Sequence, residues 1–341
     1  HLYKFFMKNY FNFSLSGEKL FPYWLIFNIG LVFVYGYGMY SMFTFFSSIT
    51  PGEMRSPEEL QALLGDSDIR FYMNILSFVL LFAGLVFYFY FFKFSVEATS
   101  YKEENFAFSG QSSEYFGKIV LGFFLTIITL GIYFPWFSKT LVDYFAQNTR
   151  YKEHNFRFNS TGTDLFLKVL LYYGLPLFGI VILNLTLTSL VGIGSIFLFL
   201  IAILCAIVVL YFYLIKWLFN YTYKNYNIQF DGKLGSFFPF FFVQLLLSYI
   251  TLGIYMPLAY LKIYQFVLQH TEAKSADKVV SFGYDSATGD DFLYLWGQIL
   301  LTLITLGLYY PWAICNIYNR VLGKTYTLTS ETDNKIIYSE A

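Results

Sequence analysis

The amino-acid sequence predicts an all-α polytopic membrane protein of about five repeated helical hairpins, joined by short cytoplasmic aromatic β-strand and turn segments. Three observations predict this fold class. The composition is poor in charge, four long apolar runs are present, and one eight-residue phrase recurs with fixed spacing around it. We expect about 8–10 membrane helices, some of them short or re-entrant.

The composition indicates a lipid environment. Of 341 residues, 57% are hydrophobic and 13% are charged, against roughly 25% charged in an ordinary soluble domain. Each of four runs is about twenty residues or longer with almost no charge, which is the length of a helix that crosses a bilayer. These runs are residues 20–48, 71–94, 165–187 and 193–219.

The first apolar run is expected to be a retained helix, because it is too long for a signal-peptide core and lacks a small-residue cleavage site. Met7 is a plausible natural start, which would make residues 1–6 an upstream extension. Cys205 and Cys315 lie in apolar stretches, where packing is the expected role. A net charge of zero and the lack of a nucleic-acid-binding motif predict no nucleic-acid partner.

An aromatic element of the form F-x-F, followed eight residues later by another aromatic, recurs along the chain. Alternating aromatics before Gly, Ser or Asp predict a short strand and a turn, and an acid or Ser/Thr before the apolar run predicts a helix cap. We therefore expect one membrane domain, residues 1–341, with a polar tail at 328–341. The predicted repeats are residues 11–105, 106–155, 156–227, 228–281 and 282–327.

The recurring phrase reads TLGIYFPW, TLGIYMPL and TLGLYYPW, and each copy starts thirteen residues after its repeat's last aromatic. Its glycine suits a left-handed helix end, its proline suits the first turn of the next helix, and its Tyr and Trp suit a lipid headgroup boundary. The phrase thus predicts a corner between two helices. The corner residues are Gly131, Tyr133, Pro135, Trp136, Gly253, Tyr255, Pro257, Gly307, Tyr309, Pro311 and Trp312.

Charge distribution predicts the orientation. All but two of the 22 Lys and Arg residues lie on the strand-bearing side or within a few turns of it, the exceptions being Arg55 and Arg70. The positive-inside rule then places the strands and both termini in the cytoplasm of a bacterial inner membrane, which the chain crosses several times.

These motifs resemble the YjgN-like bacterial inner-membrane proteins. The resemblance rests on FRFNSTGTDLF at residues 156–166, TLGIYFPW at 129–136 and YFAQNTR at 144–150. Two departures are that Leu258 replaces the tryptophan, and that the unit ending at Thr325 lacks the Asn-Thr pair. The resemblance implies a polytopic inner-membrane protein with no established activity.

Several polar residues have both a structural and a functional interpretation. Lys139 and Asp143 are spaced for an ion pair on one helical face, which either lets a short helix lie in or on the membrane without net charge or forms a substrate or ion site. Gln244 and Gln298 either bond helix to helix or face a solute path. Arg320 lies in a helix that is only moderately apolar and is expected to face protein or water.

A second group lies at the predicted cytoplasmic ends of the hairpins. Asn148, Thr149, His270 and Thr271 predict either hydrogen-bonded helix termini or a polar ring that admits solutes. Arg150, Lys152 and Arg157 predict contact with anionic lipid headgroups or with a phosphate-bearing ligand.

The sequence contains no catalytic constellation, no metal-ligand spacing and no Gly-rich nucleotide loop, so we expect neither an enzyme nor a cofactor. The first functional hypothesis is a transporter-like or channel-like permease for a small solute or lipid, because repeated hairpins recur in transport folds. The alternative is a non-enzymatic membrane subunit or scaffold that binds lipid or a protein partner through its cytoplasmic face. Membrane lipids are the expected partners, with a protein partner or homo-oligomer also open.

Overall fold

The computed structural model describes residues 6–48, 67–192, 194–276 and 278–330. The charged loop between the first two long helices, residues 49–66, lies outside the described residues, as do residues 331–341 of the predicted polar tail. The chain forms two compact units, which we describe separately. Unit 1 comprises His1–Phe13, Val96–Leu295 and Arg320–Ala341, and unit 2 comprises Ser14–Ser95 and Trp296–Asn319.

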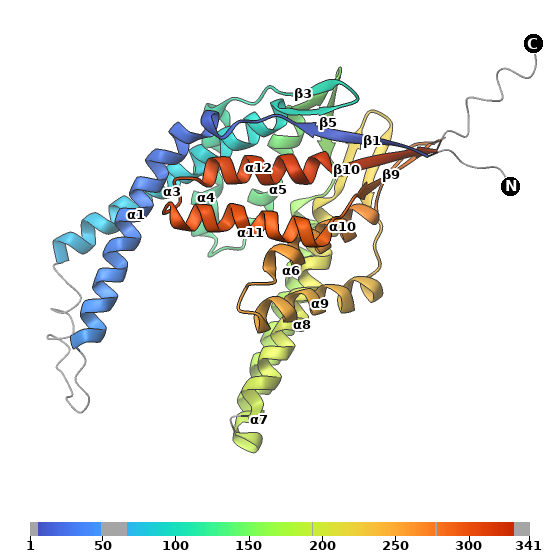
Figure 1. The fold of residues 1–341 in the computed structure, drawn as a ribbon. Helices are drawn as coiled ribbons and strands as arrows, with labels where there is room; N and C mark the ends of the chain where they lie inside the picture. Colours follow the sequence, from blue (N-terminus) through green and yellow to red (C-terminus); the bar gives the residue numbers. More distant parts are fainter. Residues whose placement is uncertain (1–5, 49–66, 193, 277, 331–341) are drawn as a thin grey trace, which may run out of the picture. The chain divides into compact units, whose positions relative to one another are not determined.

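Ten short strands of unit 1 form a closed antiparallel barrel in the order β1-β10-β9-β8-β7-β6-β5-β4-β3-β2. Figure 1 shows β1 and β10 beside β9. The strands are β1 Phe6–Phe13, β2 Thr99–Tyr101, β3 Glu104–Phe108, β4 Thr149–Tyr151, β5 His154–Phe158, β6 Asn220–Tyr223, β7 Tyr226–Phe230, β8 Thr271–Lys274, β9 Val279–Tyr284 and β10 Thr325–Ser330.

The predicted all-α fold class is therefore wrong. The aromatic segments, which we expected to be isolated connectors, pair with one another along the whole ladder. A strand of three to six residues is unstable alone, and pairing satisfies its backbone N–H and C=O groups. Pairing between distant segments determines the barrel, whereas local periodicity reports only the helices between them.

Helices connect the strands in pairs, and π-helix η1 interrupts one of them. In unit 1 they are α4 Ser112–Ile128, α5 Phe134–Asn148, α6 Gly162–Val169, η1 Leu170–Gly174, α7 Leu175–Val191, α8 Gly194–Leu218, α9 Leu234–Ile250 and α10 Met256–Gln269. Unit 2 holds α1 Gly17–Ser48 and most of α3 Ser67–Glu97, while α11 Thr288–Ile304 and α12 Tyr310–Gly323 have residues in both units. The π turn precedes Pro176, which has no N–H to donate to the carbonyl of Tyr172.

Four helices are long and apolar enough to cross a membrane, which confirms that part of the prediction. They are Gly17–Thr44, Phe71–Glu97, Gly162–Thr186 and Ser195–Leu218, and no more than 22% of the most apolar window of any of them is buried inside the protein. Many apolar side chains of these helices are exposed, for example Ile26, Phe71, Phe178 and Phe197, which suits a lipid solvent.

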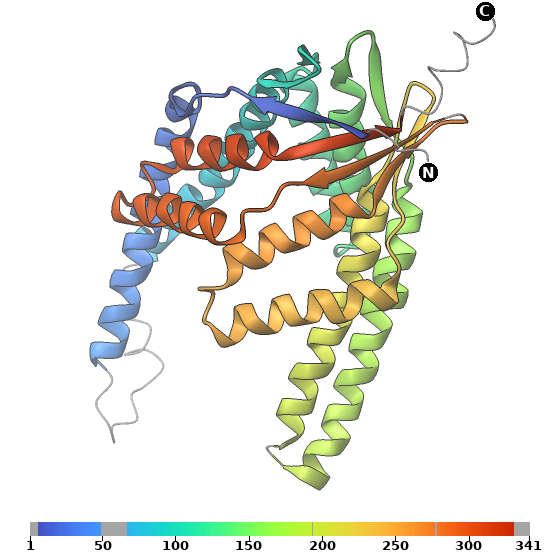
Figure 2. The same ribbon diagram turned by 45° about the vertical axis from the view of Figure 1, so that its right-hand side comes forward.

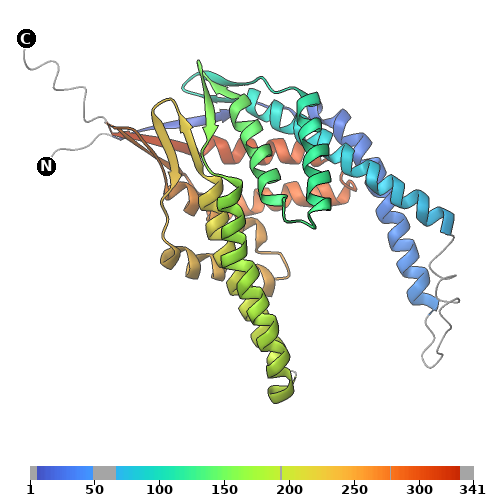
Figure 3. The ribbon, with the colours of Figure 1, turned by 180° about the vertical axis from the view of Figure 1, so that it is seen from behind.

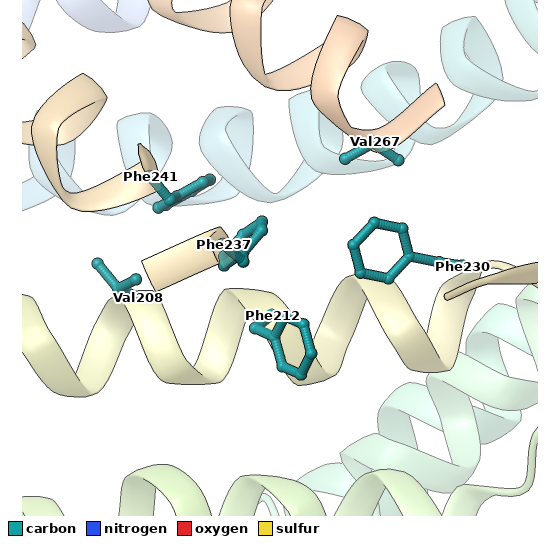
Figure 4. Packing of buried hydrophobic residues seen from close by; sticks show 6 residues of the cluster. All are labelled: Val208, Phe212, Phe230, Phe237, Phe241 and Val267. Carbon is teal, nitrogen blue, oxygen red and sulfur yellow. The ribbon is translucent and has the colours of Figure 1, made fainter. Parts of the chain in front are cut away.

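Within unit 1 the hairpin of α9 and α10 differs in direction from the long helices α7 and α8 (Figure 2). Figure 2 shows α7 and α8 packed side by side, with α9 and α10 running across them. Figure 3 shows α4 and α5 as a second short antiparallel pair. The cluster in Figure 4 joins the elements, since α8, α9, α10 and β7 all contribute to it. Its buried members are Val208, Phe212, Phe230, Phe237, Phe241 and Val267.

The three corners share one backbone geometry. In the first, the Thr129 hydroxyl accepts a hydrogen bond from the Tyr133 N–H at 3.0 Å and donates to the Leu125 carbonyl at 2.8 Å. Thr251 and Thr305 make the equivalent bonds. The leucine of each corner has a φ of +50°, and the glycine that follows has a φ between +86° and +90°. The threonine therefore links both helices of the hairpin, and the glycine allows the reversal.

We predict that Gly253→Ala destabilises the protein by about 1 kcal/mol, because an alanine there would adopt a left-handed backbone. Gly253 has a φ of +88°, and no atom lies within 4 Å of the place where the alanine Cβ would stand, so the cost is one of backbone conformation alone. Gly235 of α9 has equally open surroundings and an ordinary φ, so Gly235→Ala should leave the melting temperature unchanged or raise it. Equal melting temperatures for Gly253→Ala and the wild type would contradict the strain at the corner.

Candidate ligand-binding cavity

Five cross-strand pairs form one layer inside the barrel. The first aromatic of each F-x-F element, or the isoleucine in its place, lies opposite a residue of the strand that follows the next helices. The pairs are Phe11 with Tyr101, Phe106 with Tyr151, Phe156 with Tyr223, Ile228 with Ala273, and Phe282 with Thr327. All ten residues line one cavity of about 470 Å³, within the usual size range of small-molecule sites.

The wall formed by β1 to β6 is aromatic. In each of its three pairs the ring centroids are 4.8 Å apart. Neighbouring pairs also touch, since Tyr151 lies 5.8 Å from Tyr101 and 5.9 Å from Tyr223. Such contacts stabilise the wall beyond simple burial.

The tyrosine hydroxyls of this wall are used within the barrel. Tyr223 donates to the carbonyl of Tyr151 at 2.9 Å, and Tyr151 donates to the carbonyl of Tyr101 at 2.8 Å. The Tyr101 hydroxyl is 2.6 Å from that of Thr327, so the chain of bonds ends on β10. Burial raises the pKa of Tyr151 and of Tyr223, so both phenols are neutral at physiological pH.

The opposite wall has smaller side chains, and this difference creates the space. Ile228, Ala273 and Thr327 occupy positions that carry rings on β1 to β6. Val280 and Thr329 continue this wall beside the same cavity. The cavity therefore combines aromatic rings on one side with methyl groups and a few hydroxyls on the other.

A second layer closes the barrel at its helix end, the end at which the strands join the helices. The second aromatic of each F-x-F element is buried there, and none is more than 8% exposed. These residues are Phe13, Phe108, Phe158, Phe230 and Tyr284. We call this layer the aromatic floor; Leu268 of α10 lines the cavity on the same side.

The threonines that we singled out belong to this second layer. Thr149 lies opposite Phe108, and Thr271 lies opposite Phe230. Each donates its hydroxyl to the carbonyl four residues earlier, at 2.8 Å and 2.7 Å. Asn148 likewise donates to the Tyr144 carbonyl, so these groups serve helix termini. Thr271 also lines the cavity.

The other selected residues lie apart from the cavity. His270 stacks on Phe266 with ring centroids 4.1 Å apart. Lys139 and Asp143 form the predicted ion pair, with 2.6 Å between Nζ and Oδ2. Arg150 and Arg157, on β4 and β5, are exposed, as is Lys152 in the turn between these strands.

The two glutamines bond to corner tyrosines of their own hairpins. The Tyr255 hydroxyl donates to Oε1 of Gln244 at 2.7 Å and accepts from Nζ of Lys262 at 3.0 Å. Tyr309 donates to Oε1 of Gln298 at 3.2 Å, and Asn316 takes the place of the lysine by donating to the Tyr309 hydroxyl at 3.2 Å. These tyrosines thus point back into the hairpin. Trp136, a corner tryptophan that we expected at the lipid boundary, packs with its ring 5.4 Å from Phe166.

Asp291 is a buried carboxylate that our sequence reasoning did not select. It accepts hydrogen bonds from Nε of Arg320 at 2.6 Å, from the Tyr284 hydroxyl at 3.1 Å and from the Ala287 N–H at 3.0 Å, and it pairs with Lys324. Burial alone would raise the pKa of this carboxyl, but the hydrogen bonds from Lys324 and Arg320 lower it below its ordinary value. Its only local signal was an acid in a first helical turn, which an ordinary cap also explains.

Fold and site together define a protein with a closed barrel around a cavity, joined to helices of which four are long and apolar enough to cross a membrane. Residues 225–277 match the model of a family described as "Bacterial protein of unknown function (DUF898)". YjgN-like proteins belong to this family, so the predicted resemblance is confirmed. The matched segment contains β7, α9, α10 and β8. Neither a curated protein nor a solved structure matches the chain.

We predict that Asp291→Asn destabilises the protein by about 3 kcal/mol at pH 7, because two cations lose their buried partner. Glu114→Gln is the control, since the Glu114 side chain is 54% exposed and its pair with Lys118 should contribute about 0.5 kcal/mol or less. Thermal unfolding in one detergent measures both changes.

The pH dependence gives a second test of the same carboxylate. Because the folded-state pKa of Asp291 is lowered, its stabilisation is complete above the unfolded pKa of about 3.9 and is lost as the pH falls through the folded pKa. The difference in stability between wild type and Asp291→Asn should therefore narrow below about pH 4. A difference that stays constant down to about pH 2.5 would show that the charge does not cause it.

Proposed function

We propose that this chain is a multi-pass bacterial inner-membrane protein that binds an apolar or amphiphilic small molecule in its barrel, without catalysis. The barrel cavity carries this proposal, because all five cross-strand pairs of one interior layer line it. Predominantly apolar, concave sites with a few polar groups are the usual form of ligand pockets.

The membrane part of the proposal rests on surface polarity. Four helices are long and apolar enough to cross a bilayer. The corner tips are also apolar, and Leu130 and Leu252 are each 93% exposed. Lipid around these residues would remove that apolar surface from water. Since α9 and α10 cross α7 and α8 (Figure 2), we place this hairpin at the membrane interface.

The barrel is assigned to the cytoplasmic side. The strands and the turns that join them directly hold most of the described Lys and Arg residues outside the long helices, as the positive-inside rule requires of cytoplasmic segments. Both β1 and β10 belong to the barrel, so the two ends of the described chain lie on this same side.

Binding is favoured over transport through the barrel. Buried aromatics, among them Phe13, Phe158 and Phe230, fill the helix end of the barrel, and the cavity extends towards the helices as far as Leu268 of α10. A permease would need a conformation in which this floor opens. Transport of a solute or lipid therefore stays a prediction, as does docking of a protein partner or of a second copy.

We predict that Ala273→Phe lowers occupancy of the cavity about tenfold or more, because the ring would fill space beside Ile228 and Thr271. The measurement is photo-crosslinking of an alkyl alcohol that carries a diazirine, with the protein in lipid nanodiscs and the labelled peptides mapped by mass spectrometry. Mapping separates cavity labelling from labelling by probe dissolved in lipid.

Ala107→Phe is the matched control. Ala107 is the middle residue of an F-x-F element, so its side chain points to the outside of the barrel. This variant should label like the wild type. Ala273→Leu adds less bulk and covers the case in which Ala273→Phe does not fold. Wild-type labelling outside the strands only, or equal cavity labelling in the Ala273 and Ala107 variants, would rule out the proposed binding site.

A further inference from the structure

Two polar side chains that line the cavity lie at its turn end, the end at which hairpin turns join the strands, opposite the aromatic floor. Lys102 is in the β2–β3 turn and Tyr226 begins β7 after the β6–β7 turn, and both line the cavity. Among the described residues neither side chain makes a hydrogen bond or an ion pair with protein. The hydroxyls deeper in the cavity, those of Tyr101, Thr327 and Thr271, are bonded internally.

Lys102 has an unusual backbone conformation. It has a φ of +50° and Glu103 has a φ of +65°, in a two-residue turn between Tyr101 and Glu104. Turns of this kind favour Asn and Gly at both central positions. Each left-handed residue other than glycine costs roughly 1 kcal/mol. Lys152 and Lys224 have the same conformation in the β4–β5 and β6–β7 turns, so what distinguishes Lys102 is that it lines the cavity.

The ammonium of Lys102 is also not neutralised nearby. In the described part of the chain no carboxylate lies within 4 Å of its Nζ, and the centre of the Tyr101 ring is 5.5 Å away. Of the other barrel lysines, Lys8 pairs with Asp285 and Lys274 with Asp231. Lys152 and Lys224 also form no ion pair with the described residues, but neither lines the cavity. Lys102 thus provides positive charge at the mouth of an apolar cavity.

From this arrangement we infer that the ligand is an amphiphile with one anionic end, a carboxylate or a phosphate. Its apolar body lies against the aromatic wall, and Lys102 holds the anion at the turn end. This inference rests on the proposed function, because it names the class of ligand for the same cavity. Aromatic rings alone also attract cations, but Lys102 repels a cationic end at this position.

The test compares photo-crosslinking probes that share one alkyl diazirine chain and differ only in the end group: carboxylate, phosphate, alcohol or trimethylammonium. We expect the carboxylate or the phosphate to label the cavity of the wild type at about tenfold lower concentration than the alcohol, which corresponds to one strong charge interaction. The better of the two anions identifies the headgroup. Trimethylammonium should label most weakly.

Lys102→Gln should remove the preference for the anion and leave labelling by the alcohol unchanged. Lys152→Gln is the matched control, because Lys152 has nearly the same φ, +53°, in the β4–β5 turn but does not line the cavity. Glu104→Gln should strengthen anion binding, since Glu104 pairs with Tyr101 across the turn that holds Lys102 and a carboxylate there repels an anion.

Equal labelling by the anionic and alcohol probes, or equal loss in Lys102→Gln and Lys152→Gln, would overturn the assignment of an anionic ligand. Strongest labelling by trimethylammonium would overturn it in favour of a cation. In each of these cases the alcohol still labels the cavity, so the proposed function survives. If no probe labels the strands of the wild type, the proposed function itself fails.

Discussion

The pairing of β1 on both of its edges is the constraint on which the barrel depends. It joins β10 through five register pairs from Phe6 to Tyr10, and it joins β2 through Phe11 to Phe13. Without β1, both β2 and β10 would present an unpaired edge. On the outside of this seam Lys8 and Tyr10 both donate hydrogen bonds to Asp285 at the end of β9. Because each pair of helices leaves one strand and returns to the next, closure also fixes where the helices begin.

The two interior layers have different roles. The floor layer pairs large aromatics with threonines that also bond to helix ends, as Phe230 does with Thr271. It thereby couples sheet and helices. In the cavity layer the equivalent pairing is uneven, because Tyr223 on one side corresponds to Ala273 on the other. Protein interiors are densely packed. The cavity arises because small side chains stand at positions of this layer that carry aromatic rings on β1 to β6.

Much of the local structure was predictable, whereas the barrel was not. The corners follow from Thr129, Gly131 and Pro135, whose conformational preferences act within a few residues. The long helices follow from uninterrupted apolar runs. Barrel order instead depends on pairs such as Phe156 with Tyr223, which are 67 residues apart. The Tyr-Lys segments looked like connectors because β2 and β4 have only three residues each.

The distribution of polar and apolar side chains in the short hairpins indicates whether water or lipid surrounds them. In α9 and α10 the bonded group of Gln244, Tyr255 and Lys262 lies between the helices, and Gln244 is only 5% exposed. At the corner tip, Leu252 and Ile254 are exposed. In water this arrangement would bury polar groups and expose apolar ones, opposite to the hydrophobic effect. In lipid the same hydrogen bonds satisfy polar groups that would otherwise have no partner. The exposed Leu252 and Ile254 would then contact apolar lipid chains in place of water. The polarity of the corners therefore supports the proposed position at a membrane by an argument that does not depend on helix length.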